Sequence, residues 1–292
     1  MMMRSAPDWA VEGAHWPNRD SSRFVAVDGA QWHVQAMGEG PRLLLLHGTG
    51  AATHSWRDLA PLLARTHRVI AVDLPGHGFT EAPERAAHMA LPHVAARVQR
   101  VLQEIDEAPE AIIGHSAGAA IAVRCALDGM ALPRGVIGLN AALLPFPGAF
   151  GAWAPLMARA LFYNPAMIAL FGLRAAQPGA VARLLASTGS HVSAEAAEQY
   201  RALLTTYRHL RATIALMAHW DLVALRDELP RLQTRLTLLA AERDRAIPAA
   251  AAHEVAALAP DVRVEVAPGV GHLAHEEQPE TVAAAILRAL AA

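Results

Sequence analysis

The chain has 292 residues, of which 53% are hydrophobic and 18% charged, so it can bury the core of one large domain or two average ones. Its formal net charge is −2, which gives no indication of a nucleic-acid partner or an acidic one. All 25 basic residues are arginines. The missing lysine excludes Schiff-base catalysis, pyridoxal-phosphate chemistry and a lysine-bearing phosphate loop.

The cysteine content and the first residues indicate the cellular compartment. A single cysteine, Cys125, cannot form an intrachain disulfide, which favours a reducing compartment. No charged segment followed by an apolar one opens the sequence, so we expect a cytoplasmic protein without a secretion signal. Residues 1–22 lack hydrophobic periodicity and are interpreted as an N-terminal arm.

The next elements alternate between strands and helices. Residues 23–38 predict a hairpin, because two alternating runs flank Asp28-Gly29, a pair typical of tight hairpin turns. Apolar runs predict further strands at 42–48, 67–78, 111–116, 134–140, 235–242 and 262–269. Helices are expected at 56–63, 93–105, 117–127, 249–258 and 279–290. This alternation predicts an α/β fold with a mostly parallel central sheet covered by helices on both faces.

The alternation stops between residues 140 and 221, where helical stretches and prolines replace strands. We interpret this segment as a helical cap inserted into a core formed by residues 23–139 and 222–292. Residues 135–173 carry only one charge, Arg159, and are long enough to span a membrane. Four prolines argue against a continuous spanning helix, so we expect a lid with an apolar underside and no membrane contact.

A reactive serine is predicted at Gly114-His115-Ser116-Ala117-Gly118, between an expected strand and an expected helix. This Gly-x-Ser-x-Gly pattern is typical of a nucleophile elbow, a sharp turn that lifts the serine hydroxyl above the sheet. Glycines flank the serine because such a turn leaves no space for larger side chains. A glycine-rich turn with an incidental serine is the alternative, and the position between strand and helix favours the elbow.

A serine nucleophile needs a base, and the base needs an acid that orients it. Asp244 and His272 each follow an expected strand, in the chain order Ser, Asp, His that this arrangement uses. Both would lie at the carboxyl edge of the sheet, where open α/β sheets bind ligands. Asp221 and Glu242 are alternatives for the acid, and a surface role such as that expected for His275 is the alternative for His272.

Backbone amides would complete the site. The amide of Ala117 begins a helix and can donate to an oxyanion, and a second donor is expected at Thr49, or else at Gly50, in the glycine-containing loop after the strand at 42–48. No HxxxH or CxxC spacing supports zinc, so we expect neither a metal nor a cofactor. We expect the substrate pocket to be lined by His47, Gly48, His115, Phe146, Phe150, Trp153 and Met157.

The sequence resembles the α/β-hydrolase superfamily through "LLLLHGTG", "VIAVDLPGHGFT", "GHSAG", "ERDRAIP" and "GVGHLAHEEQPE", from about residue 25 to the end. Because the elbow carries serine rather than aspartate, it is more similar to the esterase, C–C hydrolase and perhydrolase branches than to the haloalkane dehalogenases and epoxide hydrolases. "WPNRDSSRFV", "HGTGAATHSWRDLAPLLA", "GHSAGAAIAVRCALDG" and "GLNAALLPFPG" also resemble the hydrolase-fold family of bacteriochlorophyll biosynthesis, which is described as a magnesium-chelatase accessory family.

Two hypotheses from different classes follow. In the first, the chain is a serine hydrolase that cleaves an ester or related acyl bond of a bulky hydrophobic substrate, such as a porphyrin ester. In the second, which the resemblance to the accessory family implies, the fold holds a tetrapyrrole or a magnesium-chelatase subunit without catalysis. The complete set of Ser116, Asp244 and His272 favours the enzyme, because binding alone does not need three such groups in register.

Overall fold

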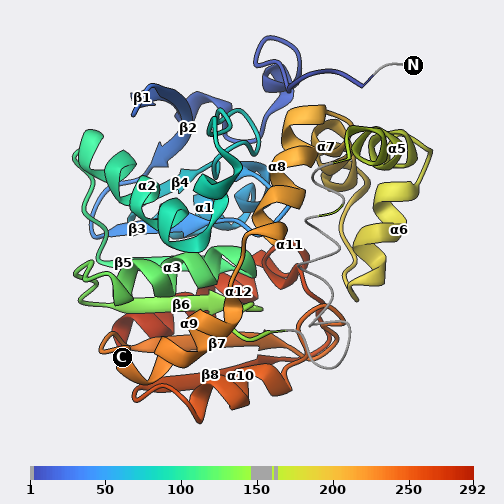
Figure 1. Cartoon of the computed structure of the whole chain (residues 1–292). Coiled ribbons are helices and arrows are strands. Elements are labelled where there is room, and N and C mark those ends of the chain that lie inside the picture. Colours follow the sequence, from blue (N-terminus) through green and yellow to red (C-terminus); the bar gives the residue numbers. More distant parts are fainter. Residues whose placement is uncertain (1–2, 146–159, 161–163) are drawn as a thin grey trace.

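The computed structural model describes residues 3–145, 160 and 164–292 (Figure 1). The predicted pocket residues Phe146, Phe150, Trp153 and Met157 lie outside the described residues. Eight strands form one sheet in the order β1-β2-β4-β3-β5-β6-β7-β8. Their bounds are β1 Ser22–Val27, β2 Ala30–Met37, β3 Arg42–Leu46, β4 Arg68–Val72, β5 Ala111–His115, β6 Gly135–Leu139, β7 Leu236–Ala241 and β8 Val262–Ala267.

Strands β3 to β8 are parallel to one another. The β1–β2 hairpin joins them through an antiparallel pairing of β2 with β4. Asp28 and Gly29 both have positive φ angles, 50° and 74°, as a two-residue hairpin turn requires. The predicted hairpin and the mostly parallel sheet are therefore confirmed.

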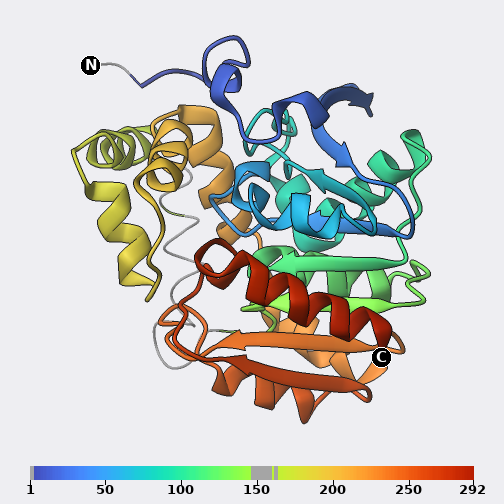
Figure 2. The same ribbon diagram turned by 180° about the vertical axis from the view of Figure 1, so that it is seen from behind.

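Helices cover both faces of the sheet, and the strand residues alternate between them. Leu43 and Leu45 pack with α1 (Leu59–Leu63) and α12 (Pro279–Ala291). Leu44 and Leu46 pack on the opposite face, where α2 (Leu91–Glu104), α3 (Ala117–Leu127), α9 (Leu222–Glu228) and α10 (Ala250–Ala256) lie. Figures 1 and 2 show the two layers from opposite sides. An apolar run buried on both faces therefore explains why β3 lacks a polar alternation.

Between β6 and α9, the described residues form helices α5 (Pro165–Ala175), α6 (Ala180–Ser187), α7 (Ala194–Leu204) and α8 (Tyr207–Ala218), with an isolated bridge between Arg4 and Thr206. These helices lie to one side of the sheet, beyond the carboxyl ends of the parallel strands (Figures 1 and 2). Within the described residues, no helix has both the length and the apolar character to cross a membrane.

The N-terminal residues contact the start of α8. They form short 3-10 turns at Glu12–His15 and Arg19–Ser21. Before these turns, Arg4 and Ser5 present two backbone carbonyl oxygens to α8. These oxygens accept hydrogen bonds from the amides of Tyr207, at 2.9 Å, and Arg208, at 2.8 Å. Amides in the first turn of a helix have no partner within the helix, so the N-terminal segment satisfies two that α8 leaves open.

The start of α3 lies against the end of β3 with no space between the backbones. A Cβ atom added to Gly118 would lie 1.9 Å from the carbonyl oxygen of Leu46, and one added to Gly114 would lie 2.4 Å from the amide nitrogen of Ala119. Real Cβ atoms do not approach backbone atoms so closely, so both positions require glycine in this packing. The two glycines of the predicted elbow are thus explained by backbone contact.

Replacing Gly118 with alanine should lower the free energy of unfolding by about 2–4 kcal/mol, because backbone atoms of β3 or α3 must shift. Urea denaturation measures this loss. Gly29→Ala is the matched control: its φ is +74°, yet nothing lies within 4 Å of an added Cβ. The control should cost only about 1 kcal/mol, from backbone strain alone. Equal losses in the two variants would contradict the packing explanation.

Candidate active site

Ser116 occupies the sharp turn between β5 and α3. Its backbone has φ 48° and ψ −108°, a conformation that costs free energy in a residue other than glycine. Neighbouring strand ends hold it there, because its amide donates to the carbonyl of Leu139 at 2.9 Å and its carbonyl accepts from the amide of Ala142 at 3.1 Å. The side chain is partly exposed. A serine hydroxyl is thus presented at the carboxyl edge of the sheet.

Asp244 and His272 lie in contact, although they follow different strands, β7 and β8. The Nδ1 atom of His272 donates to Oδ2 of Asp244 at 2.7 Å. The Asp244 side chain is fully buried, whereas that of His272 retains 11% exposure. Because the carboxylate holds the proton on Nδ1, Nε2 of the neutral ring is left with a free lone pair, as a general base requires.

Three further donors hold the carboxylate of Asp244. Its Oδ1 accepts from the amides of Ala246 and Ile247, at 2.7 and 2.8 Å. Its Oδ2 accepts from the side-chain amide of Asn140 at 2.7 Å, in addition to His272. These bonds fix the direction in which the carboxylate faces the imidazole.

Asn140 is a site residue that the sequence did not reveal. It directly follows β6, has a φ of 48° and is 3% exposed. Asparagine tolerates this left-handed conformation better than most residues. Its position directly after an apolar strand, level with the strand ends that carry Ser116 and Asp244, was the available signal, since parallel strands end at a common edge.

The two alternative acids have other partners. Glu242 is exposed and accepts from the amide of Gly269 at 2.8 Å, which fixes the turn after β8. Asp221 is the N-cap of α9 and accepts from the amide of Ala224 at 2.9 Å. Neither residue has a recorded contact with His272, whereas Asp244 does.

The loop after β3 lies directly beside the serine. A Cβ atom added to Gly48 would lie 3.3 Å from Cβ of Ser116 and 2.7 Å from Nδ1 of His115. Thr49 is partly exposed, and Gly50 is buried with a φ of 78°. Ala117, at the first position of α3, is also buried. The predicted oxyanion donors therefore belong to two segments that flank Ser116.

His209 of α8 fixes this loop from the cap side. Its Nε2 donates to the carbonyl of Gly50 at 3.0 Å, and its Nδ1 accepts from the amide of Gly78 at 3.0 Å. The ring is fully buried, and burial lowers its pKa to about 4, so it is neutral near pH 7. A residue of the cap thus joins the loop after β3 to the loop after β4.

The two histidines predicted to line the pocket are buried and bound to backbone atoms. His47 accepts the amide of Leu74 on Nε2 at 2.9 Å and donates from Nδ1 to the carbonyl of Gly48 at 2.8 Å. His115 donates from Nε2 to the carbonyl of His272 at 2.9 Å, and the two rings lie 4.8 Å apart. Burial lowers the pKa of both histidines. In this arrangement they support the loops that carry Gly48 and His272.

A buried polar network joins the cap to the helix that follows His272. Glu276 of α11 (Ala274–Glu277) accepts from Tyr200 of α7 at 2.7 Å and from Ser55 at 2.6 Å. Arg57 donates two hydrogen bonds to its second oxygen, at 2.7 and 2.6 Å. Burial raises the pKa of Glu276, and the nearby Arg57 guanidinium opposes this shift. The loop of His272 is therefore supported by both the core and the cap.

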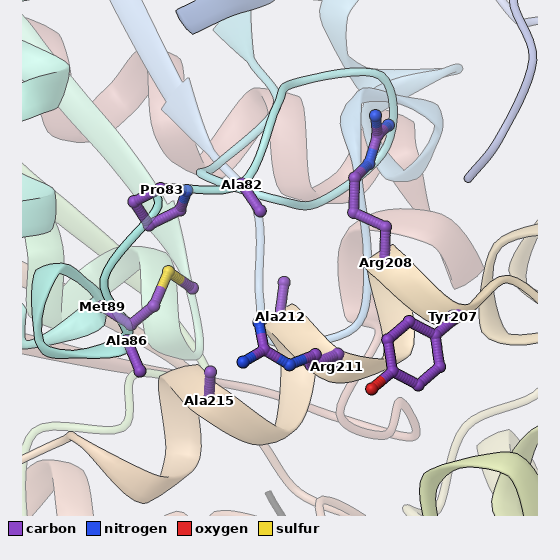
Figure 3. A pocket seen from close by; sticks show the side chains of 9 residues that line it. All are labelled: Ala82, Pro83, Ala86, Met89, Tyr207, Arg208, Arg211, Ala212 and Ala215. Carbon is purple, nitrogen blue, oxygen red and sulfur yellow. The ribbon is translucent and has the colours of Figure 1, made fainter. Parts of the chain in front are cut away.

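A pocket of about 150 Å³ lies beside α8 (Figure 3). Side chains of α8 face the segment that carries Ala82 and Pro83 there. It is lined by Ala82, Pro83, Ala86, Met89, Tyr207, Arg208, Arg211, Ala212 and Ala215. None of Ser116, Asp244 and His272 lines it, so it is separate from the candidate active site. Among the described residues, no cluster of three His, Cys, Asp or Glu side chains is suited to a metal ion.

Comparisons with known proteins agree with this architecture. A model of the Alpha/beta hydrolase family matches residues 43–285. The chain is 38% identical over 276 residues to the Magnesium-chelatase 30 kDa subunit of Rhodobacter capsulatus, covering 94% of this chain and 96% of that protein. It is 30% identical to the Pimeloyl-[acyl-carrier protein] methyl ester esterase of Xanthomonas oryzae pv. oryzae, covering 84% and 94%. A crystal structure of an alpha/beta hydrolase fold protein from Burkholderia ambifaria superposes with a TM-score of 0.73 at 25% identity, covering 92% and 98%.

The free energy of unfolding should fall as the pH decreases from about 6.5 to about 4. Burial lowers the pKa of His47, His54, His77, His115, His209 and His275. The unfolded chain binds protons at an ordinary histidine pKa near 6.5, whereas folded His209 binds one only near 4. The unfolded state therefore binds more protons in this window, and stability present above pH 6.5 is lost below it.

Urea denaturation between pH 7.5 and 4.5 measures this slope. The slope reports how many protons the chain takes up on unfolding. His209→Gln should lower this number by about one, because the variant lacks a histidine that gains a proton when the chain unfolds. His253→Gln, at an exposed histidine, should leave it unchanged. The explanation fails if His209→Gln leaves the pH slope as it is.

Proposed function

The chain belongs to the alpha/beta hydrolase family, and we propose that it acts as a serine hydrolase on an ester or related acyl bond. One observation carries this proposal. The hydrogen bond between His272 Nδ1 and Asp244 Oδ2, 2.7 Å long, orients a base at the sheet edge where the strained turn presents Ser116. A structural histidine in a surface loop would need neither the buried carboxylate nor its four donors.

In the proposed mechanism, Nε2 of His272 takes the proton of the Ser116 hydroxyl as its oxygen attacks the acyl carbonyl. Asp244 stabilises the imidazolium that forms. The amides of Ala117 and Thr49, or Gly50 in place of Thr49, donate to the oxyanion. His272 then protonates the leaving alcohol, and the acyl group remains on Ser116. A water molecule, deprotonated by His272, cleaves this acyl-enzyme and releases the acid.

We propose a bulky hydrophobic substrate. The apolar composition of residues 135–173 supports this, because a wall that faces the serine would favour large apolar groups. The pocket would include Gly48, with His47 and His115 behind it. The esterase relative supports ester chemistry, and the relative named as a magnesium-chelatase subunit makes a porphyrin ester a reasonable substrate class.

A second candidate function is non-catalytic binding of a tetrapyrrole or of a magnesium-chelatase subunit. The 38% identity to a protein named as such a subunit favours it, because the similarity covers 94% of the chain. The two functions differ in what they require of Ser116. Catalysis needs a nucleophilic hydroxyl, whereas binding does not.

A fluorophosphonate probe should label the wild-type chain and not Ser116→Ala, because the activated hydroxyl attacks the phosphorus. Turnover of a small aryl ester should fall by about 10⁴- to 10⁶-fold in Ser116→Ala and in His272→Ala, since the three residues act as a unit. Ser55→Ala is the matched control: Ser55 is buried and bound to Glu276, so labelling should persist.

Labelling that persists in Ser116→Ala would remove the nucleophile assignment. Absence of labelling in the wild type, together with saturable quenching of tryptophan fluorescence by a magnesium porphyrin, would favour the binding function instead. Preference for acetyl over long-chain esters would contradict the bulky substrate.

Asp244→Asn should reduce turnover by up to about 10⁴-fold, because an amide can hold the imidazole in the wrong tautomer. Asp221→Asn is the control: Asp221 caps α9 and asparagine caps a helix about as well, so turnover and stability should both stay close to those of the wild type. Steady-state kinetics of both variants show which carboxylate orients His272. A crippled Asp221→Asn enzyme beside an active Asp244→Asn enzyme would show that the acid is wrongly assigned.

A further inference from the structure

Helices α5 and α6 expose an unusual concentration of large apolar side chains. Leu170, Phe171, Leu173 and Leu184 are 49%, 46%, 42% and 56% exposed. Nine large apolar residues of the described chain are at least 37% exposed, and four of them fall within the 15 positions from Leu170 to Leu184. We call these four residues, together with Arg174 and Arg183, the cap-tip patch. Contiguous apolar surface of this kind marks an interaction site more often than a free surface.

The exposed residues of the patch alternate along α5 and α6 with residues that are buried. Ile168 and Gly172 of α5 are buried, and Val181 and Leu185 of α6 are buried in the same way. Phe171 and Leu184 lie three residues after the buried Ile168 and Val181, so they flank the buried face of each helix. Both helices lie at the outer edge of the cap in Figures 1 and 2. Ile168, Gly172, Val181 and Leu185 are thus covered in the folded chain, whereas Leu170, Phe171, Leu173 and Leu184 keep 42% to 56% of their surface exposed.

The charge of the patch has one sign. Arg174 and Arg183 are exposed and line a shared shallow depression with Gln177, Pro178 and Ala180. The sequence contains no aspartate or glutamate between Asp128 and Glu195. On neighbouring α7, Glu198 is paired with Arg201. The guanidinium groups of Arg174 and Arg183 therefore have no carboxylate partner from their own segment of the chain. Planar guanidinium groups bind phosphate oxygens well.

We propose that the cap-tip patch docks the protein on the surface of an anionic phospholipid bilayer. Leucine and phenylalanine would enter the boundary between headgroups and acyl chains, and the two arginines would bind lipid phosphates. A second copy of the chain fits less well, because a symmetric contact would bring the arginines of both copies together. Phenylalanine and arginine are also enriched at the centres of protein interfaces, so the vesicle experiment below separates a bilayer from a protein partner.

This docking is independent of the proposed catalytic activity, and it revises the expectation of no membrane contact that the sequence suggested. That expectation concerned a segment that spans the bilayer, which requires about 20 apolar residues in one helix. Docking on the surface requires only an exposed apolar and basic face. The position of the patch on the cap would also bring an apolar substrate in the bilayer close to the cap.

Co-sedimentation of the full chain with vesicles tests the proposal. The wild type should bind vesicles of phosphatidylcholine and phosphatidylglycerol in a 3:1 ratio, and bind pure phosphatidylcholine at least about 10-fold more weakly, because each basic residue near an anionic surface contributes about 1 kcal/mol. Raising the salt from about 0.1 to 0.5 M should weaken binding through screening. Leu184→Ser and Arg183→Glu should each weaken binding to the anionic vesicles by at least several-fold.

Two matched variants control for the type of change. Leu258→Ser replaces a leucine exposed on the core, and Arg65→Glu reverses an exposed charge on the core, so both should bind as the wild type does. Failure of the wild type to bind anionic vesicles would overturn the proposal, as would equal binding of all variants. A concentration-dependent dimer that Leu184→Ser abolishes, without vesicle binding, would assign the patch to a second copy instead. Labelling by the fluorophosphonate probe is a separate readout, so failure of one proposal leaves the other standing.

Discussion

The close approach of α3 to the end of β3 is the constraint on which the candidate site depends. Without side chains at Gly114 and Gly118, the first turn of α3 reaches the carbonyl of Leu46. This contact sets the serine turn beside the loop that follows β3, so that Ser116, Ala117 and Gly48 share one small volume. The positive φ at Ser116 costs free energy. The packing of the surrounding strands offsets this cost and holds the turn in its conformation.

The acid and the base come together for a topological reason. Asn140, Asp244 and His272 follow β6, β7 and β8, which are adjacent parallel strands, so their loops emerge at one edge. The cap then joins these loops. The carbonyl of Thr188 accepts from the amide of Arg245 at 3.0 Å, and the hydroxyl of Ser190 accepts from the amide of Leu273 at 2.9 Å. The segment between β6 and α9 thus holds both loops.

The sequence predicted the sheet and the hairpin well because each depends on local pattern. Four consecutive leucines, Leu43 to Leu46, can be placed only in a strand covered on both faces, and Asp28-Gly29 determines its own turn. Asp244 could be placed at a strand end, but its preference over Asp221 rests on a contact across 28 residues to His272. Asn140 escaped notice because its bond to Asp244 spans 104 residues and leaves no periodic signature. The expectation that His275 lies at the surface was wrong: it is 1% exposed, because its ring contacts Ser55, which is 220 residues away in the sequence.

The hydrogen bonds of Arg4 and Ser5 to the start of α8 have a practical consequence for handling the protein. Helix α8 carries His209, which holds the carbonyl of Gly50 beside the serine turn. Proteolytic trimming of the first ten residues would remove the acceptors of two helix amides and loosen the first turn, in which His209 is the third residue. A preparation clipped at its N-terminus would therefore differ from the intact chain in the loop next to Ser116.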